Sequence, residues 1–123
     1  MATVLIVDDE FGLAEMAGEL LTILGHSVAT AINGKLALAM LDQVRPDVIL
    51  LDMMMPIMSG PEALHVLKAN AEHRDIPVIL MSAAGREVVT ADLEPLMAGF
   101  LQKPFSYQEL VAALDRVFAA VRG

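Results

Sequence analysis

Val4-Leu5-Ile6-Val7 is a run of four apolar residues that stops abruptly at Asp8-Asp9. An apolar run without polar alternation is typical of a strand that helices cover on both faces of a parallel sheet. The run is therefore predicted as the first strand of such a sheet. Four further segments are predicted as its other strands: residues 27–31, 48–51, 78–81 and 99–101.

The first two segments between the predicted strands repeat apolar residues at the spacing of amphipathic helices. These apolar residues are Leu13, Ala17, Leu20, Leu21 and Leu24 in the first segment, and Leu36, Ala37, Met40, Leu41 and Val44 in the second. Gly25 is placed to end the first helix in a left-handed conformation. Pro46 is predicted to end the second helix, because proline disfavours a helical conformation of the residue before it.

Two later helices have predicted starting points. Ser59 and Glu62 have the spacing of a capping box, in which each side chain binds the backbone N–H of the other residue. Ser106 and Glu109 repeat this spacing and open a segment that carries apolar residues along one face. The stretch 86–96 is only loosely periodic, and it is predicted as the remaining helix, the fourth of five.

Five strands that alternate with five helices predict a doubly wound α/β fold, because right-handed crossovers place helices on both faces of a parallel sheet. In this architecture ligands bind outside the carboxyl ends of the strands. Functional side chains are therefore expected directly after each strand.

Ionisable or hydroxyl side chains do follow four of the predicted strands, namely Asp8 and Asp9, Asp52, Ser82, and Lys103. Three carboxylates brought together repel one another, which raises a pKa or favours a bound cation. Mg²⁺ is the expected cation, because it binds one or two carboxylates and leaves positions for water and phosphate oxygens. The absence of cysteine from the chain, and of histidine near these positions, argues against zinc or copper.

Asp52 is the predicted nucleophile, because a carboxylate can attack a phosphoryl group and form an acyl phosphate. It follows the hydrophobic third strand, which is expected at the centre of the sheet. Lys103 would supply a positive charge and Ser82 a hydroxyl for the phosphoryl oxygens. Taken singly, each of these residues has an ordinary structural explanation in a helix cap, a turn or the surface. Only the set indicates chemistry.

The composition of the chain limits its function classes. Its 123 residues suit one domain, and 16 acidic against 8 basic residues give a net charge of −8, which repels nucleic acid and anionic membranes. The apolar runs fall well short of the roughly 20 residues that span a bilayer, and the start of the chain lacks the pattern of a secretory signal. We expect a cytoplasmic protein with one domain over residues 1–123 and no output domain. The hydrophobic content of 56% fits either a dense core or a contact surface, such as that of a homodimer formed on activation.

Four motifs in order make the chain resemble the receiver domain of two-component response regulators over nearly its whole length. They are Val7-Asp8-Asp9-Glu10, Asp52 with Pro56 and Gly60, Ser82-Ala83, and Lys103-Pro104-Phe105. The resemblance implies a flavodoxin-like sheet in the order 2-1-3-4-5. It also implies a signalling switch rather than an enzyme, with at most Mg²⁺-dependent self-phosphorylation and autodephosphorylation. A sensor histidine kinase or a histidine phosphotransfer protein would supply the phosphoryl group, and an output protein would receive the signal.

The resemblance also assigns roles to residues. Asp52 would be the phosphoacceptor, and the ligands of Mg²⁺ or Mn²⁺ would be Asp9, Asp52, the main-chain carbonyl of Met54 and, through water, Asp8. Lys103 and Ser82 would assist the transfer, and the Lys103-Pro104 bond would be cis. Ser82 and Phe100 would be the switch residues.

Two features depart from the family pattern. Phe100 lacks the hydroxyl of a tyrosine, so it can report activation only by packing. The segment 94–99 contains Pro95 and Met97 where the family more often has a small turn, so the partner at this surface is expected to be atypical.

The sequence leaves three other functions to consider. A phosphatase with an aspartate nucleophile resembles a pattern with a second aspartate two positions on, where this chain has Met54. A dinucleotide-binding module would carry G-x-G-x-x-G after the first strand, which is missing. A phosphorylation-independent interaction module on the same fold is the remaining alternative, although the acceptor, metal and lysine positions are all retained.

Overall fold

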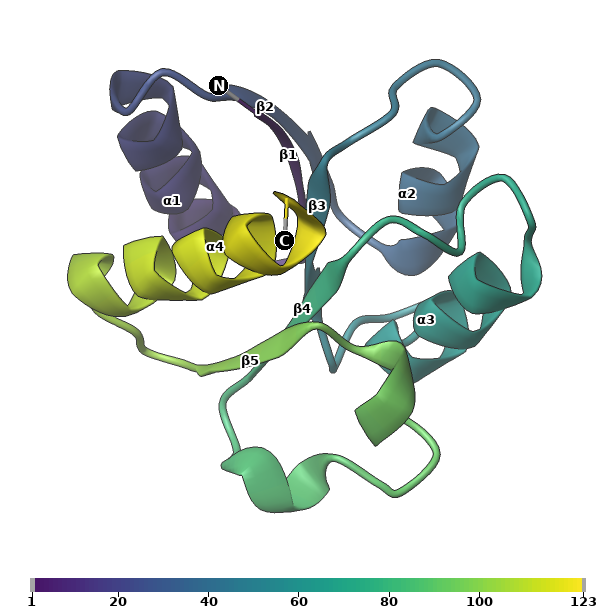
Figure 1. Cartoon of the computed structure of the whole chain (residues 1–123). Coiled ribbons are helices and arrows are strands. Elements are labelled where there is room, and N and C mark those ends of the chain that lie inside the picture. Colours follow the sequence, from purple (N-terminus) through teal and green to yellow (C-terminus); the bar gives the residue numbers. More distant parts are fainter. Residues whose placement is uncertain (1, 123) are drawn as a thin grey trace.

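A computed structural model describes residues 2–122 as a five-stranded parallel sheet with helices on both faces (Figure 1). The strands are β1 (Thr3–Val7), β2 (Ser27–Ala31), β3 (Val48–Asp52), β4 (Val78–Ser82) and β5 (Gly99–Gln102). Their order is β2-β1-β3-β4-β5, which confirms both the predicted strands and the predicted topology. β3 therefore lies at the centre of the sheet, between β1 and β4.

Four α-helices pack on the sheet: α1 (Phe11–Ile23), α2 (Gly34–Met40), α3 (Gly60–Ala69) and α4 (Tyr107–Arg122). α1 and α4 cover one face, while α2 and α3 cover the other (Figure 1). The core is divided accordingly, because alternate residues of each strand point to opposite faces. Leu5, Ile49 and Leu80 pack towards α2 and α3, whereas Ile6, Leu50 and Ile79 pack towards α1 and α4. In the part of the chain that the structure describes, no helix is long and apolar enough to cross a membrane.

The helix ends follow the predicted capping chemistry. The Ser59 hydroxyl accepts from the Glu62 N–H and the Glu62 carboxylate accepts from the Ser59 N–H, so the capping box of α3 is complete. Ser106 and Glu109 form the same reciprocal pair before α4. Gly25, after α1, has a φ of 96°, the left-handed conformation predicted for it. α2 ends at Met40, earlier than its apolar spacing indicates, so Pro46 lies several residues beyond the helix end.

The predicted helix over 86–96 is wrong. Two short 3₁₀ helices, η1 (Arg86–Val88) and η2 (Glu94–Leu96), occupy this stretch, so the structure has four α-helices rather than five over the described residues. Val88, Val89 and Thr90 are β-branched and disfavour a helix, and Val89 is extended. Pro95 has no N–H to continue a helical ladder. Only one bond of α-helical span, from the Glu94 N–H to the Thr90 carbonyl, forms here.

Candidate functional site

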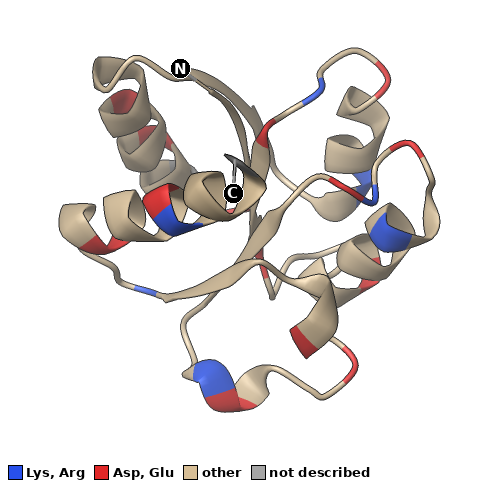
Figure 2. Ribbon diagram, viewed as in Figure 1, with Lys and Arg blue, Asp and Glu red and all other residues tan. Residues whose placement is uncertain are grey.

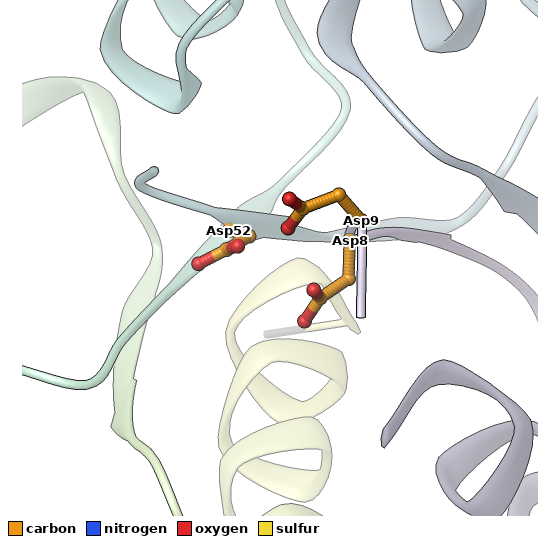
Figure 3. Close-up of side chains that lie close together, drawn as sticks. All are labelled: Asp8, Asp9 and Asp52. Atoms are coloured by element: carbon orange, nitrogen blue, oxygen red, sulfur yellow. The ribbon is translucent and has the colours of Figure 1, made fainter. Parts of the chain in front are cut away.

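An acidic group lies at the carboxyl ends of β1 and β3. Val7 is the register partner of Leu51, so Asp8 and Asp9 leave β1 beside Asp52, the last residue of β3. One carboxylate oxygen from each of these aspartates lies within 4.8 Å of the others. Figure 3 shows the three side chains projecting from adjacent strand ends. Asp8 and Asp52 are buried, whereas Asp9 is exposed to solvent.

Lys103 joins this group from the end of β5. Its Nζ lies 2.7 Å from Asp8 Oδ2 and 3.3 Å from Asp52 Oδ1, and its side chain is only 9% exposed. Glu10 Oε1 lies farther away, at 3.8 Å from Nζ. The Lys103-Pro104 bond is cis, which is the geometry that the family resemblance predicts. A single buried cation is therefore shared between two buried carboxylates.

The charges at this site perturb one another. Burial raises the pKa of Asp52 above its ordinary value, and the nearby charge of Asp8 raises it further. Lys103 and the backbone N–H of Met54 act in the opposite direction without cancelling the effect. Burial lowers the pKa of Lys103, but its close polar contacts and charge interactions with Asp8 and Asp52 outweigh burial and raise it. The site thus favours the protonated form of Lys103 and disfavours the carboxylate form of Asp52.

The loop after β3 is folded tightly against the acceptor position. The Gly60 N–H donates to the Met53 carbonyl, and a Cβ on Gly60 would lie 2.2 Å from the Asp52 carbonyl oxygen. Only glycine fits at that distance. The backbone N–H of Met54 interacts with the Asp52 carboxylate. Met54 itself is 81% exposed, so packing places no constraint on the identity of its side chain. Ile57, farther along the loop, has a φ of 73°, a rare conformation for a β-branched residue.

Ser82 and Phe100 lie on the two strands beyond the acceptor. Ser82 is the last residue of β4, is buried, and its hydroxyl accepts from the Ala84 N–H at 3.1 Å. Phe100 is the register partner of Leu80 and packs with the core on the α2 and α3 face. Phe100 is thus set back from the strand ends, unlike the other predicted residues.

The structure brings together four residues that sequence reasoning selected, namely Asp8, Asp9, Asp52 and Lys103. Two contacts were not foreseen. The close approach of Gly60 to the Asp52 backbone could have been suspected from the sequence. A helix start does not require glycine, so a glycine at that position indicates a steric constraint. The guanidinium of Arg86 lies 6.0 Å from the centroid of the Phe100 ring, and nothing in the sequence pattern indicates that contact.

The acidic group has the donor set of a hard divalent cation. Asp8 Oδ2 is buried and, within the described residues, has no hydrogen bond of good geometry, although Lys103 Nζ pairs with it ionically. Three carboxylates thus face one lysine, and a divalent cation would balance the excess charge. Asp8, Asp9 and Asp52 offer oxygen ligands on an open side of the sheet, where water and phosphate oxygens can complete an octahedron. The residues present fit Mg²⁺ or Mn²⁺.

Comparison with known proteins identifies the family. The model of the response regulator receiver domain matches residues 4–115. The probable transcriptional regulatory protein TcrX of Mycobacterium tuberculosis is 42% identical over 91% of this chain, which covers 47% of that protein. The phosphate regulon transcriptional regulatory protein PhoB of Pseudomonas aeruginosa is 40% identical over 94% of this chain and 51% of its own length. The chain belongs to the receiver domains of response regulators in two-component systems.

Solved structures agree with this assignment. The chemotaxis response regulator CheY4 of Vibrio cholerae is 31% identical, with a TM-score of 0.88 over 95% of this chain and 98% of that one. The response regulator TrrA of Thermotoga maritima, solved in complex with Mg²⁺ and BeF, is 27% identical, with a TM-score of 0.84 over 95% of this chain and 99% of that one. Receiver domains are signalling modules rather than enzymes in the strict sense, and they bind Mg²⁺ at an acidic pocket.

The chain spans about half the length of the curated relatives it matches. One of these is the DNA-binding response regulator MtrA of Mycobacterium tuberculosis, 37% identical over 97% of this chain and 50% of its own length. The expectation of no direct nucleic-acid partner therefore does not hold for such longer proteins. The charge argument behind it applies only to these 123 residues.

Proposed function

We propose that the chain is a phosphorylation-dependent switch of a two-component phosphorelay, with Asp52 as the phosphoacceptor. The observation that carries the proposal is the position of the Asp52 carboxylate. It stands at the end of the central strand, 3.3 Å from Lys103 Nζ and beside Asp8 and Asp9. A carboxylate held next to both a cation and a metal-binding pair is prepared to attack a phosphoryl group.

In this proposal Asp9, Asp52 and the main-chain carbonyl of Met54 hold Mg²⁺ or Mn²⁺, and Asp8 acts largely through water. When bound, the metal offsets negative charge on the phosphoryl oxygens. The resident charges favour a bound cation, because burial and Asp8 both raise the pKa of Asp52 and so disfavour its carboxylate form. Asp8 has a second role, since its 2.7 Å contact holds Lys103 Nζ at the strand ends.

The transfer step conserves atoms and charge. An Asp52 carboxylate oxygen attacks the phosphorus of a phosphohistidine, forming a P–O bond while the P–N bond breaks. The departing imidazole nitrogen keeps the electron pair of that bond and takes up a proton from water. The Lys103 ammonium offsets charge on one phosphoryl oxygen, and the Ser82 hydroxyl donates to another. A sensor histidine kinase or a histidine phosphotransfer protein is the proposed donor.

The signal follows from the new contact of Ser82. Its hydroxyl accepts from the Ala84 N–H and keeps its own proton free to donate. A movement of Ser82 towards the phosphoryl group would therefore carry the chain that follows β4 with it. Phe100, on the same face of the sheet, would move with it and alter the surface that an output protein contacts. Since Phe100 has no hydroxyl, this signal passes through packing alone.

Intact-mass measurement with acetyl phosphate tests the proposal. We expect the wild-type protein with Mg²⁺ to gain one phosphoryl group, and Asp52→Asn or a chelator to abolish the gain. Lys103→Met should reduce the gain strongly, while Arg116→Met, at an exposed position of α4, serves as its control. A wild type that neither gains the group nor binds beryllofluoride, a phosphoryl mimic, would instead support a phosphorylation-independent interaction module.

A further inference from the structure

Arg86, Glu94 and Phe100 form a cluster on the segment that lacks the predicted helix. The Arg86 guanidinium lies over the Phe100 ring, 6.0 Å from its centroid, and Arg86 Nη2 lies 2.5 Å from Glu94 Oε1. An arginine in this position is attracted by the face of the ring, and the carboxylate fixes its orientation. We call these three residues the Arg86 clamp.

The clamp joins η1, η2 and β5, which otherwise have few shared contacts. Residues 83–98 connect β4 to β5 as an extended loop at the outer end of the sheet (Figure 1), and both 3₁₀ turns carry charged residues (Figure 2). Leu93 is the fully buried anchor of this loop. Val88, Val89, Leu96 and Met97 are only partly buried where they pack on the same core. Exposed polar pairs add to these contacts, such as the 2.9 Å pair between His65 Nε2 and Asp92 Oδ2. With one fully buried side chain in this loop, exposed side-chain pairs such as the Arg86 clamp contribute to its arrangement.

Two routes lead from Ser82 to the clamp. Along the chain, Ser82 holds the Ala84 N–H at 3.1 Å, and Arg86 follows only two residues later. Across the sheet, Ser82 projects from β4 to the same face as Leu80, the register partner of Phe100. A movement of Ser82 towards a phosphoryl group would shift the chain that carries Arg86. It would also change the space around Phe100 on the neighbouring strand.

We propose that Arg86 and Glu94 are positioning residues that stabilise the resting form of the switch by holding Phe100 in place. This inference rests on the proposed function. We take as the resting form the arrangement in which the clamp and the hydrogen bond from the Ala84 N–H to the Ser82 hydroxyl are both present. A movement of Ser82 towards a phosphoryl oxygen would shift the loop that carries Arg86. A contact made in only one of two states lowers the apparent affinity for a ligand of the other state. The clamp therefore opposes activation.

Calorimetric titration with beryllofluoride in the presence of Mg²⁺ measures this opposition without a partner protein. We expect Arg86→Gln to bind beryllofluoride about two- to fivefold more tightly than wild type, the range for a partly exposed ion pair with an added ring contact. Glu94→Gln should show a smaller gain, since it leaves the guanidinium over the ring. In the double variant the two gains should not add, because both variants break the same pair. Arg86→Lys keeps the charge and should restore most of the wild-type affinity.

Charge-matched controls separate the clamp from a general change in the field around the site. Arg116→Gln on α4 changes the net charge as Arg86→Gln does, and Glu19→Gln on α1 changes it as Glu94→Gln does. Both positions are exposed and lie away from residues 83–98. Both should bind beryllofluoride with wild-type affinity. Thermal unfolding of every variant without ligand reports the purely structural contribution, which would shift the melting temperature and leave the affinity unchanged.

The outcomes are distinguishable. Equal affinities for wild type, Arg86→Gln and Glu94→Gln, or equal gains in the two controls, would overturn the clamp while leaving the proposed function intact. Failure of the wild type itself to bind beryllofluoride would overturn the proposed function, and the clamp with it.

Discussion

The two faces of the sheet are covered in different ways. On one face α1 and α4 form continuous helices, and α4 alone buries Leu110, Ala113, Leu114 and Val117. On the other face α2 and α3 cover only part of the sheet, and residues 83–98 cover the outer part with two 3₁₀ turns. Regions with few buried apolar contacts and exposed polar attachments open at low free-energy cost. We therefore expect the face covered by α1 and α4 to contribute more to the free energy of unfolding, and residues 83–98 on the other face to rearrange more easily.

A pair of buried leucines tests this contrast with the largest expected effect. Leu114 on α4 and Leu93 in the loop are each only 2% exposed. We expect Leu114→Ala to lower the free energy of unfolding by about 3–4 kcal/mol, because α4 cannot collapse into the cavity. Leu93→Ala should cost about 1–2 kcal/mol, since a loop without a continuous helix can refill more of the lost volume. Urea denaturation compares the two variants. Equal losses would show that the two faces are equally rigid.

A pair of glycines near helix starts gives the next largest effect. A methyl group on Gly60 would meet the Asp52 backbone, whereas one on Gly12 of α1 meets nothing within 4 Å. Gly60→Ala should cost about 2–3 kcal/mol and reduce phosphorylation by acetyl phosphate, because it displaces the strand end that carries the acceptor. Gly12→Ala should stabilise α1 by about 0.5–1 kcal/mol and leave phosphorylation unchanged. Normal phosphorylation of Gly60→Ala would contradict the link between loop fit and site.

Asp52 is the last residue of β3, the central strand, and so lies at the edge of the sheet between its two covered faces. Since its pKa is raised in the folded protein, the folded state binds the proton more tightly, and stability falls as the pH rises through and above the ordinary aspartate pKa of 3.8. At neutral pH the ionised side chain is therefore a cost. Asp52→Asn should raise the free energy of unfolding at pH 7.

Denaturation at several pH values without metal checks the sign of this effect. The advantage of Asp52→Asn should shrink towards zero as the pH falls to 3.8 and below, where both side chains are neutral. Adding Mg²⁺ at pH 7 should stabilise wild type more than Asp52→Asn, since binding to the folded state alone raises stability. A variant less stable than wild type at pH 7 would contradict the direction of the pKa shift.

The smallest expected effect concerns strain on the α2 and α3 face. Ile57 is held at positive φ and is 76% exposed, so its side chain brings little burial to offset the backbone cost. Ile57→Gly should raise stability by about 0.5–1 kcal/mol. Ile32→Gly is the matched control, because Ile32 is also exposed but lies outside the left-handed region, and it should lower stability. Thermal unfolding measures both, and a destabilised Ile57→Gly would show that the side chain makes a stabilising contact.

Features that depend on residues close together in the sequence were predicted correctly, and features that depend on distant residues were predicted less well. The five strands and the capping boxes at Ser59 and Ser106 depend on neighbouring residues, and the sequence predicted them correctly. The convergence of Asp8, Asp9, Asp52 and Lys103 followed from one further rule, that parallel strands end on the same side. The helix over 86–96 failed because its weak apolar period was given more weight than Val88, Val89, Thr90 and Pro95. The Arg86 contact with Phe100 depends on the path of that loop, which no local pattern encodes.

The position of Lys103 also bears on the order in which a growing chain can complete its fold. The three aspartates are all synthesised by residue 52, but the lysine that lies between Asp8 and Asp52 comes about fifty residues later, after β5. A nascent chain that has emerged only through β4 thus carries a cluster of negative charge without its counter-ion. Seating Asp52 at the end of the central strand is costly until then. Final consolidation of the sheet is consequently tied to the last strand, and a metal ion binding early would act as a temporary substitute for Lys103 during synthesis.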